Sequence, residues 1–340
     1  MKKLTLFGVL LVVGAQLFAQ QAEIVYVEYP EVEVKREDGT TFLADFGDQL
    51  SFGDSVVTTR YGSAEIELAS GGTVTVSPDT VYAISEIETS GGPQTVMSVA
   101  FGSVRFRFQQ MTSRREPSIG TPTSVAGVRG TEFTTYVAID GSTVFVVDEG
   151  EVAVSGGGST VTLASNEGVQ VNPGQPPGEK FDALEREFDF QQFNQDRFEA
   201  LIADPVAAVT GLARTMDEFI HQLEIIVPQY EEAEAALAEA QQHREELAET
   251  ASEEDQQAYY LETFVPLRND AYRLFRNMRF YARSALSLRR FVLGRLAVTL
   301  ELEDIAGRTP VNYGDFQAAY ADLLERYERV VVPVLDPSDI

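Results

Sequence analysis

The hydrophobic residues of this chain change their spacing partway along the sequence, and that change constrains the fold more than any other feature. Up to residue 171, short runs such as Ala64-Glu65-Ile66-Glu67-Leu68 alternate apolar and polar residues, which is typical of strands with one buried face. Beyond residue 180, apolar residues recur at three- and four-residue intervals, which is typical of amphipathic helices. We therefore predict a multidomain chain in which β structure precedes α structure.

The segment between the two halves, Asn172-Pro173-Gly174-Gln175-Pro176-Pro177-Gly178, is too rich in Pro and Gly to continue a strand ladder or a helix. We interpret it as a linker. The predicted boundaries are an all-β domain over residues 23–172, a Pro/Gly linker over 173–180 and an antiparallel helical bundle over 181–335.

The first half consists of short runs rich in β-branched and aromatic residues, separated by turn dipeptides such as Asp38-Gly39 and Asp140-Gly141. No helical pattern intervenes, which argues against βαβ units. Short strands at this spacing are typical of a sandwich, a barrel or a β-roll. We expect a β-roll or a solenoid-like sandwich.

The second half carries helix start and stop signals. Asp204-Pro205 is typical of a helix start, with Asp as the N-cap and Pro in the first turn. We expect that helix to end near Val227, because Pro228 follows it. Further helices are expected over residues 229–250, 252–302 and 316–331.

Charge is distributed unevenly over this half. Residues 231–255 carry ten acidic residues and one arginine, and residues 268–295 carry eight arginines and one acidic residue. Four of these arginines have the spacing of one helix face: Arg276, Arg279, Arg283 and Arg290. One interpretation is that the acidic and basic helices pack as neighbours and neutralise each other. The other is that the arginine row binds an acidic partner or an anionic glycan through bidentate contacts.

The N-terminus has the organisation of a secretory signal peptide. Lys2 and Lys3 precede an apolar run over residues 4–17, which Phe18-Ala19 follows. We expect residues 1–19 to be removed after Ala19, with Ala22 as the second choice. The alternative is an uncleaved anchor, for which the run is short against the roughly 20 residues of a membrane span. The mature protein is then periplasmic or secreted, without a transmembrane segment.

The composition excludes several function classes. A formal net charge of −27 argues against binding to nucleic acid or to an anionic membrane surface. The absence of cysteine excludes disulfides, thiolate metal sites, cysteine nucleophiles and a lipid anchor on an N-terminal cysteine.

Candidate metal ligands are sparse in the sequence. Asp217 precedes His221 by four residues, and the other histidine is His243. Neither arrangement is specific for a metal. A turn-rich stretch with Asp38, Asp45, Asp48 and Asp54 lacks EF-hand spacing. We predict no metal, no cofactor and no catalytic residue.

Residues 121–133, Thr-Pro-Thr-Ser-Val-Ala-Gly-Val-Arg-Gly-Thr-Glu-Phe, resemble the central signature of the FecR domain. This is the extracytoplasmic β-domain of iron-dicitrate-sensor-like proteins. The flanking residues resemble the same family in the same order, at 62–76, 101–105, 143–152 and 161–171, so that the resemblance covers roughly residues 50–173. It implies an all-β domain and an extracytoplasmic location.

The chain also departs from the family. In those sensors the domain follows a cytoplasmic anti-sigma segment and a membrane helix, whereas here it follows the predicted signal peptide, and helices replace the tail that meets the receptor. The resemblance therefore does not carry over iron sensing or sigma-factor control.

We expect structural roles for the signature residues. Glycines allow backbone conformations or close approaches that a Cβ atom forbids, and an arginine can donate several hydrogen bonds to loop carbonyls or to a carboxylate such as Glu132 or Glu149. Arginine is a poor general base at neutral pH, which disfavours catalysis here. The candidate structural residues are Gly127, Arg129, Gly130, Thr131, Glu132, Phe133 and Gly150.

These observations favour a non-enzymatic extracytoplasmic FecR-domain protein that acts as an interaction, scaffold or signal-relay module with a protein partner at the cell envelope. The alternative is a module that binds cell-wall glycan through exposed side chains of the β domain. A third hypothesis, an enzyme with a carboxylate pair, requires a concave acidic pocket.

Overall fold

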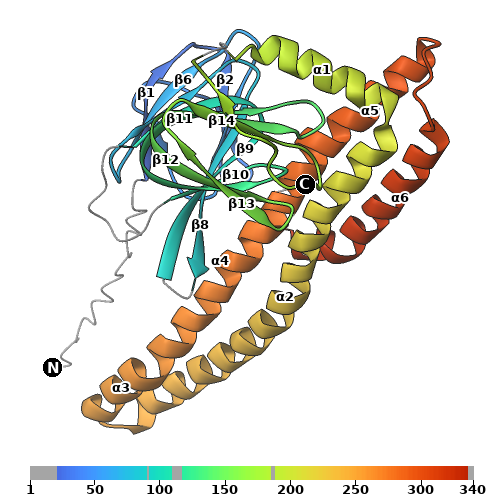
Figure 1. The fold of residues 1–340 in the computed structure, drawn as a ribbon. Helices are drawn as coiled ribbons and strands as arrows, with labels where there is room; N and C mark the ends of the chain where they lie inside the picture. Colours follow the sequence, from blue (N-terminus) through green and yellow to red (C-terminus); the bar gives the residue numbers. More distant parts are fainter. Residues whose placement is uncertain (1–20, 90–91, 109–116, 185–187, 336–340) are drawn as a thin grey trace, which may run out of the picture.

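The computed structural model describes residues 21–89, 92–108, 117–184 and 188–335; the side chain of Arg129 is also outside the description. A β-rich N-terminal region lies against a helical C-terminal region (Figure 1), which confirms the predicted order of β before α. The predicted signal peptide lies outside the described residues.

The strands of the described residues belong to one continuous, mostly antiparallel sheet. They are β1 (Ala22–Val27), β2 (Val32–Lys35), β3 (Thr41–Leu43), β4 (Gln49–Leu50), β5 (Ser55–Thr58), β6 (Ala64–Leu68), β7 (Thr73–Val76), β8 (Val81–Thr89), β9 (Gly92–Arg107), β10 (Ser118–Gly120), β11 (Val125–Val137), β12 (Thr143–Gly156), β13 (Ser159–Ala164), β14 (Glu167–Val171) and β15 (Phe181–Asp182).

The sixteen-residue strand β9 is central to the sheet. Its first half pairs with β8 and, in parallel, with β10. Its second half pairs with β7 on one edge and β11 on the other. Because one strand joins two sets of partners, the sheet curves around a shared interior.

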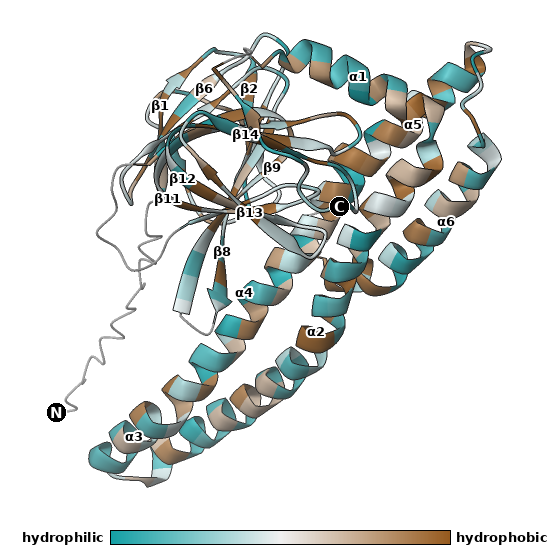
Figure 2. Ribbon diagram, viewed as in Figure 1, coloured by the Kyte–Doolittle hydropathy of each residue, from teal (hydrophilic) through white to brown (hydrophobic). Residues whose placement is uncertain are grey.

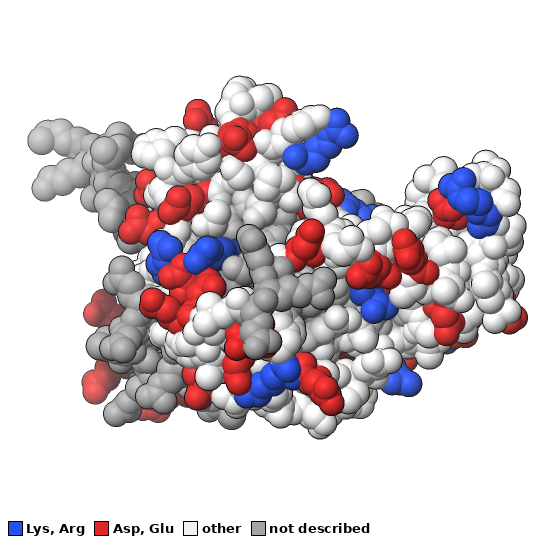
Figure 3. Space-filling model, turned by 45° about the horizontal axis from the view of Figure 1, so that its top comes forward, with Lys and Arg blue, Asp and Glu red and all other residues white. Residues whose placement is uncertain are grey.

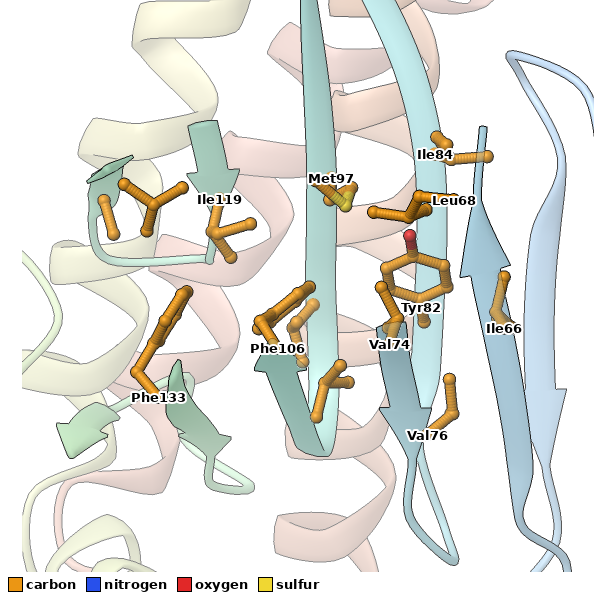
Figure 4. Close-up of a cluster of buried hydrophobic side chains, with 14 of the residues drawn as sticks. Ile66, Leu68, Val74, Val76, Tyr82, Ile84, Met97, Phe106, Ile119 and Phe133 are labelled. Atoms are coloured by element: carbon orange, nitrogen blue, oxygen red, sulfur yellow. The ribbon is translucent and has the colours of Figure 1, made fainter. Parts of the chain in front are cut away.

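The interior of the sheet is filled by apolar side chains from alternate positions of the strands, and Figure 4 shows them facing one another. Phe133 of β11 is fully buried, and its ring centroid lies 5.1 Å from that of Phe106 of β9. On the other side of Phe106, the ring centroid of Tyr82 of β8 lies 6.4 Å from that of Phe106. Burial raises the pKa of the Tyr82 hydroxyl.

The helical region has four helical segments in the described residues: one short helix, two long rods and a final helix. The first two are α1 (Phe190–Ala203) and α2 (Pro205–Thr250). The second rod is continuous and comprises α3 (Glu253–Tyr259), a π-helical turn (Tyr260–Phe264), α4 (Val265–Ser287), a second π-helical turn (Leu288–Leu293) and α5 (Gly294–Ile305). After a loop, α6 (Tyr313–Val330) leads into a 3-10 turn, η3 (Val332–Val334).

Helix α2 begins as predicted and ends later than predicted. Asp204 caps it by accepting a hydrogen bond from the Ala207 N–H at 3.0 Å. The helix then continues through Pro228 to Thr250, so the expected end near Val227 is wrong. An interior proline costs a helix about 3 kcal/mol. Burial of α2 residues on both sides of the proline, at Leu223 and Ala240, offsets that cost.

The predicted linker is packed in place. Arg214 of α2 donates to the Gly174 carbonyl at 2.7 Å, and the Gly178 N–H donates to Gln170 of β14 at 2.9 Å. Strand β15 then pairs with β14, although residue 181 was expected to begin the helical region. The sheet therefore extends further along the chain than its hydrophobic pattern indicated.

In Figure 2, hydrophilic and hydrophobic residues alternate along α2 and α4, as they do in amphipathic helices. Among the described residues, none of the helices has both the length and the apolar character that crossing a membrane requires.

Replacing Phe133 with alanine tests the core. Removal of a fully buried ring that stacks on Phe106 should lower the free energy of unfolding by about 3–5 kcal/mol in urea titrations followed by circular dichroism. Phe46→Ala is the control, because Phe46 is 70% exposed, and it should change the value by less than about 0.5 kcal/mol. Equal effects would show that the β11–β9 contact is not the centre of the core.

Candidate functional site: the signature hairpin and the sheet–helix interface

The signature residues lie on β11, where its pairing with β12 is interrupted. Arg129 pairs with Glu151, but Glu132 pairs with Glu149, so that two residues of β11 face Gly150 alone. A second shift follows before Phe133. The signature is therefore a β-bulge, which bends the hairpin and turns side chains to new directions.

Two glycines make this bulge possible. Gly130 has a φ of 56° and Gly150 a φ of 89°, values that residues with a side chain rarely adopt. A Cβ atom at Gly150 would lie 2.7 Å from Cγ2 of Thr131 and 2.8 Å from the Gly130 carbonyl oxygen. Gly127 differs, because it has no positive φ and a Cβ there would meet no heavy atom within 4 Å. The expected conformational need for glycine therefore does not hold at position 127.

Glu132 is held by two arginines of the neighbouring strand. Arg105 donates to Oε1 at 2.9 Å, and Arg107 donates to both carboxylate oxygens at 2.9 and 3.1 Å. Asp148 of β12 lies 3.0 Å from Arg105 as well. The hydrogen bonds from Arg107, followed by those from Arg105, hold the pKa of Glu132 below its ordinary value. The proposed contact of Arg129 with Glu132 or Glu149 concerns a side chain outside the described residues.

The remaining signature residues point inward. Thr131 is 1% exposed, and Phe133 is fully buried. The signature thus anchors the hairpin to the core on one face and carries a surface ion-pair cluster on the other. Acidic and basic side chains are interspersed on the face of the molecule shown in Figure 3, with acidic ones more numerous.

The predicted arginine row lies mostly against the sheet. Arg276 binds Glu86 and Glu88 of β8, with 2.9 Å between its Nη2 atom and the Glu88 carboxylate. The next residue, Asn277, accepts from the Glu88 N–H at 2.7 Å and donates to the Glu88 carbonyl at 3.0 Å. This pair of bonds is the one that an adjacent strand would make, so α4 completes the edge of β8.

The next arginines approach the β2–β3 turn. Arg279 and Arg283 lie 4.0 and 3.8 Å from the same carboxylate oxygen of Glu37, and Arg290 lines the groove beyond them. The neutralising carboxylates described here come from the sheet, whereas one interpretation of the sequence placed them on the acidic helix. The role of the row in binding a partner stays a prediction.

A second docking point joins the β11–β12 turn to the start of the helical region. Arg197 of α1 lies 2.9 Å from the buried carboxylate of Asp140. Asn194 accepts from the Ile139 N–H at 2.9 Å, and Thr215 of α2 donates to the Pro122 carbonyl at 2.8 Å. Sequence reasoning did not find these residues, although the Asp140-Gly141 turn was recognised.

Between the two docking points lies a groove of about 2,470 Å³, with walls from the sheet, α2, α4 and the second π-helical turn. Its walls include carboxylates, but Asp54 and Glu86 are paired with Arg36 and Arg276.

Two of the candidate metal ligands, Asp217 and His243, have other partners in the structure. Asp217 pairs with Arg326, and the ring of His243 packs edge-on against Tyr259. Across the ranges that the structure describes, no three His, Asp or Glu side chains converge as a metal site would require.

With this geometry, the chain can be compared with known proteins. Residues 54–153 match the family model described as FecR protein, which confirms the resemblance drawn from the signature. The match lies within the β-rich region and covers less than a third of the chain.

Two solved structures, both of a candidate anti-sigma factor from Parabacteroides distasonis ATCC 8503, are similar at 18% and 17% identity with TM-scores of 0.33 and 0.31. Each similarity covers 38% of this chain and 59% of the other, so the chain spans less than two thirds of those proteins. No curated protein matches the chain.

Glycine substitutions distinguish the two classes of signature glycine. Gly150→Ala should lower the free energy of unfolding by about 1–3 kcal/mol, because it forces a side chain into a positive-φ position against Thr131. Gly127→Ala is the matched control and should change stability by less than about 0.5 kcal/mol, because its Cβ would enter open space. Denaturant unfolding of both variants checks the prediction, which an unaltered Gly150→Ala protein would contradict.

Acid titration tests the ion-pair cluster. Because the pKa of Glu132 is lower in the folded protein, its contribution to stability is present above the ordinary glutamate pKa of about 4.3 and is lost as pH falls through the folded-state value. Glu132→Gln should therefore remove part of the stability loss between about pH 5 and the acid limit. Unfolding free energies measured over this range provide the test, with Glu245→Gln on exposed α2 as control. An unchanged acid slope in Glu132→Gln would contradict the cluster's role.

Proposed function

We propose that this protein is a non-enzymatic, extracytoplasmic interaction module that relays or organises signals at the cell envelope. The FecR match over the β-rich region supports a regulatory role, because that domain belongs to a family of sensors. In this proposal the β-rich region is a β-roll platform, and the helices form a bundle that presents the partner-binding surface with it.

The extracytoplasmic location rests on the N-terminal sequence. A basic start, an apolar run and a small residue at position 19 support export and cleavage, which places the mature chain in the periplasm or outside the cell. The lack of cysteine suits such a compartment, because no thiol can be oxidised there.

A non-enzymatic role is supported by the chemistry of the clefts. The groove is lined by arginines and carboxylates that hold the two regions together. Among the described residues, His221 is the one histidine that lines it. Two carboxylates of this groove, Asp54 and Glu86, form ion pairs with Arg36 and Arg276, whereas a hydrolytic pair needs carboxyl groups that are available to the substrate.

The observation that carries the proposal is the docking of α4 on β8 through Arg276 and Asn277. A FecR-like domain whose free strand edge is occupied by its own helical region presents one composite surface to a partner. Recognition of the partner should therefore depend on both regions and on the way in which they are docked.

Cross-linking capture from an envelope extract tests this dependence. The mature chain should capture a defined protein, identified by mass spectrometry, and the Arg276→Gln/Asn277→Ala variant should recover it at least tenfold less. The matched control is Arg268→Gln/Asn269→Ala, which alters two exposed neighbours on the same helix. Equal recovery by all three chains would show that the docked interface has no part in recognition.

A second candidate function is cell-wall glycan binding, which exposed aromatic rings favour. Tyr29, Phe46 and Tyr61 are 65%, 70% and 62% exposed on turns of the β-rich region. Such rings can stack on sugar faces, as aromatic side chains do on other apolar surfaces. Sedimentation of the mature chain with purified peptidoglycan, without capture of a protein, would replace the first function with this one.

A further inference from the structure

Helix α5 is apolar on two opposite faces. Leu296 and Leu300 are fully buried in the core of the helical region. Val298, Leu302 and Ile305 are 55%, 59% and 74% exposed. Successive residues of an α-helix are about 100° apart around its axis, so the two sets of side chains point in opposite directions. Because helices that are apolar on all sides are normally covered on all sides, we expect another molecule to cover the outer face of α5.

The three exposed residues form one row, which we call the α5 stripe. Their spacings of four and three residues place Val298, Leu302 and Ile305 on one side of the helix, over roughly 10 Å of its length. Single exposed apolar residues are common on soluble proteins, whereas apolar residues that are aligned on one surface mark interaction sites. The α5 stripe therefore has the character of a docking surface.

The α5 stripe continues the face of the second rod that packs on the sheet. The guanidinium carbon of Arg295 lies 4.0 Å from the centre of the Phe101 ring of β9, and Arg295 also pairs with Asp79 at 3.5 Å. Arg295 is three residues before Val298 and seven before Leu302, so these side chains share one face. In Figure 1, α5 runs on past the sheet. A molecule bound to the stripe would therefore extend the interface that already exists between the rod and the sheet.

Carboxylates border the α5 stripe on the side of α6. Burial raises the pKa of the Tyr313 hydroxyl at the start of α6, and the nearby charges of Glu301 and Asp304 raise it further, which places both carboxylates on that side. Glu301 is exposed, and Asp304 accepts a hydrogen bond from the Thr309 hydroxyl at 2.6 Å. The border of the stripe is therefore negative, and it complements an occupant that carries positive charge beside its apolar residues.

A second copy of this chain fits the α5 stripe poorly. In a twofold antiparallel pair of helices the same flank of each helix meets, so Glu301 and Asp304 would face their own equivalents. Arg308 is a nearby cation, but it already donates to Glu303 at 2.8 Å. Each copy also carries a net charge of −27, which repels a second copy and an anionic membrane surface alike.

We propose that the α5 stripe binds an amphipathic helix of another protein that carries lysine or arginine beside its apolar residues. The apolar side chains of that helix pack on Val298, Leu302 and Ile305, and its cations pair with Glu301 and Asp304. A helix fits better than an extended strand, because side chains at three- and four-residue spacing form ridges that pack between those of another helix. The stripe is separate from the α4–β8 contact, so a failure of this proposal would leave the proposed function unchanged.

A peptide-binding experiment on the mature chain tests the surface. The probe is a synthetic peptide of about 18 residues, long enough to form a helix, with leucines along one face, lysines beside them and alanine elsewhere. Fluorescence anisotropy of a fluorescein label gives its dissociation constant. An isomer with the same composition, whose leucines are spread around the helix, should bind at least tenfold more weakly, and so should a peptide with glutamate in place of lysine. Equal binding of the three peptides would overturn the proposal.

Matched variants of the protein locate the binding. Leu302→Ser/Ile305→Ser should weaken the leucine–lysine peptide at least tenfold, and because both side chains are exposed the fold should be unaffected. The control is Ile225→Ser/Leu261→Ser, which alters two exposed apolar residues elsewhere on the helices and should leave the affinity unchanged. Glu301→Gln should weaken the peptide about threefold, as the loss of one surface ion pair does. The same affinity for Leu302→Ser/Ile305→Ser as for the unaltered chain would contradict the proposal.

Two further measurements distinguish the other possible occupants. Size-exclusion chromatography with light scattering should show a monomer, and a dimer that Leu302→Ser/Ile305→Ser abolishes would overturn the proposal in favour of a second copy. Vesicles of phosphatidylethanolamine and phosphatidylglycerol should sediment without the chain. Sedimentation of the chain with these vesicles that the same variant abolishes would overturn the proposal in favour of a lipid surface.

Discussion

The arrangement of the two regions depends on one strand edge. Strand β8 pairs with β9 along its length, but β5 covers only its first residues, and the opposite edge near Glu88 is left to the helices. An uncovered edge can pair with other chains. Asn277 closes it with a donor and an acceptor, as a peptide group would, and Arg276 neutralises the carboxylates that line it. This contact fixes α4 beside the sheet, and the position of α4 in turn shapes the groove.

The local features of this fold could be predicted from the sequence, because they depend on neighbours in the chain. Alternating residues indicated the strands, and Asp204 indicated the start of α2, since an N-cap acts within one turn. The end of α2 could not be predicted in this way. Pro228 weakens a helix locally, but packing of the residues on either side against distant helices decides the outcome, and a single local pattern does not contain that information.

In the candidate site, too, local features could be predicted from the sequence and distant contacts could not. The signature identified the place where the hairpin bulges, and Gly130 and Gly150 have the positive φ values that such a bulge requires. The partners of Glu132 could not be read from spacing, since Arg105 and Arg107 are 27 and 25 residues away and are brought near by strand register. The partners of the arginine row could not be read from spacing either, because Arg276 and Glu86 lie 190 residues apart.

Scarce basic residues hold a strongly acidic chain together. With 53 acidic and 26 basic residues, most pairs of surfaces on this protein should repel each other at low salt. The helices meet the sheet where arginines are available: Arg197 reaches Asp140, Arg276 reaches β8, and Arg295 lies over the Phe101 ring at 4.0 Å. The pair with buried Asp140 is the least screened of these, so salt should loosen the α4 side before the α1 side. Because acidic residues outnumber basic ones, the helices dock on the sheet in the arrangement that the positions of the arginines allow.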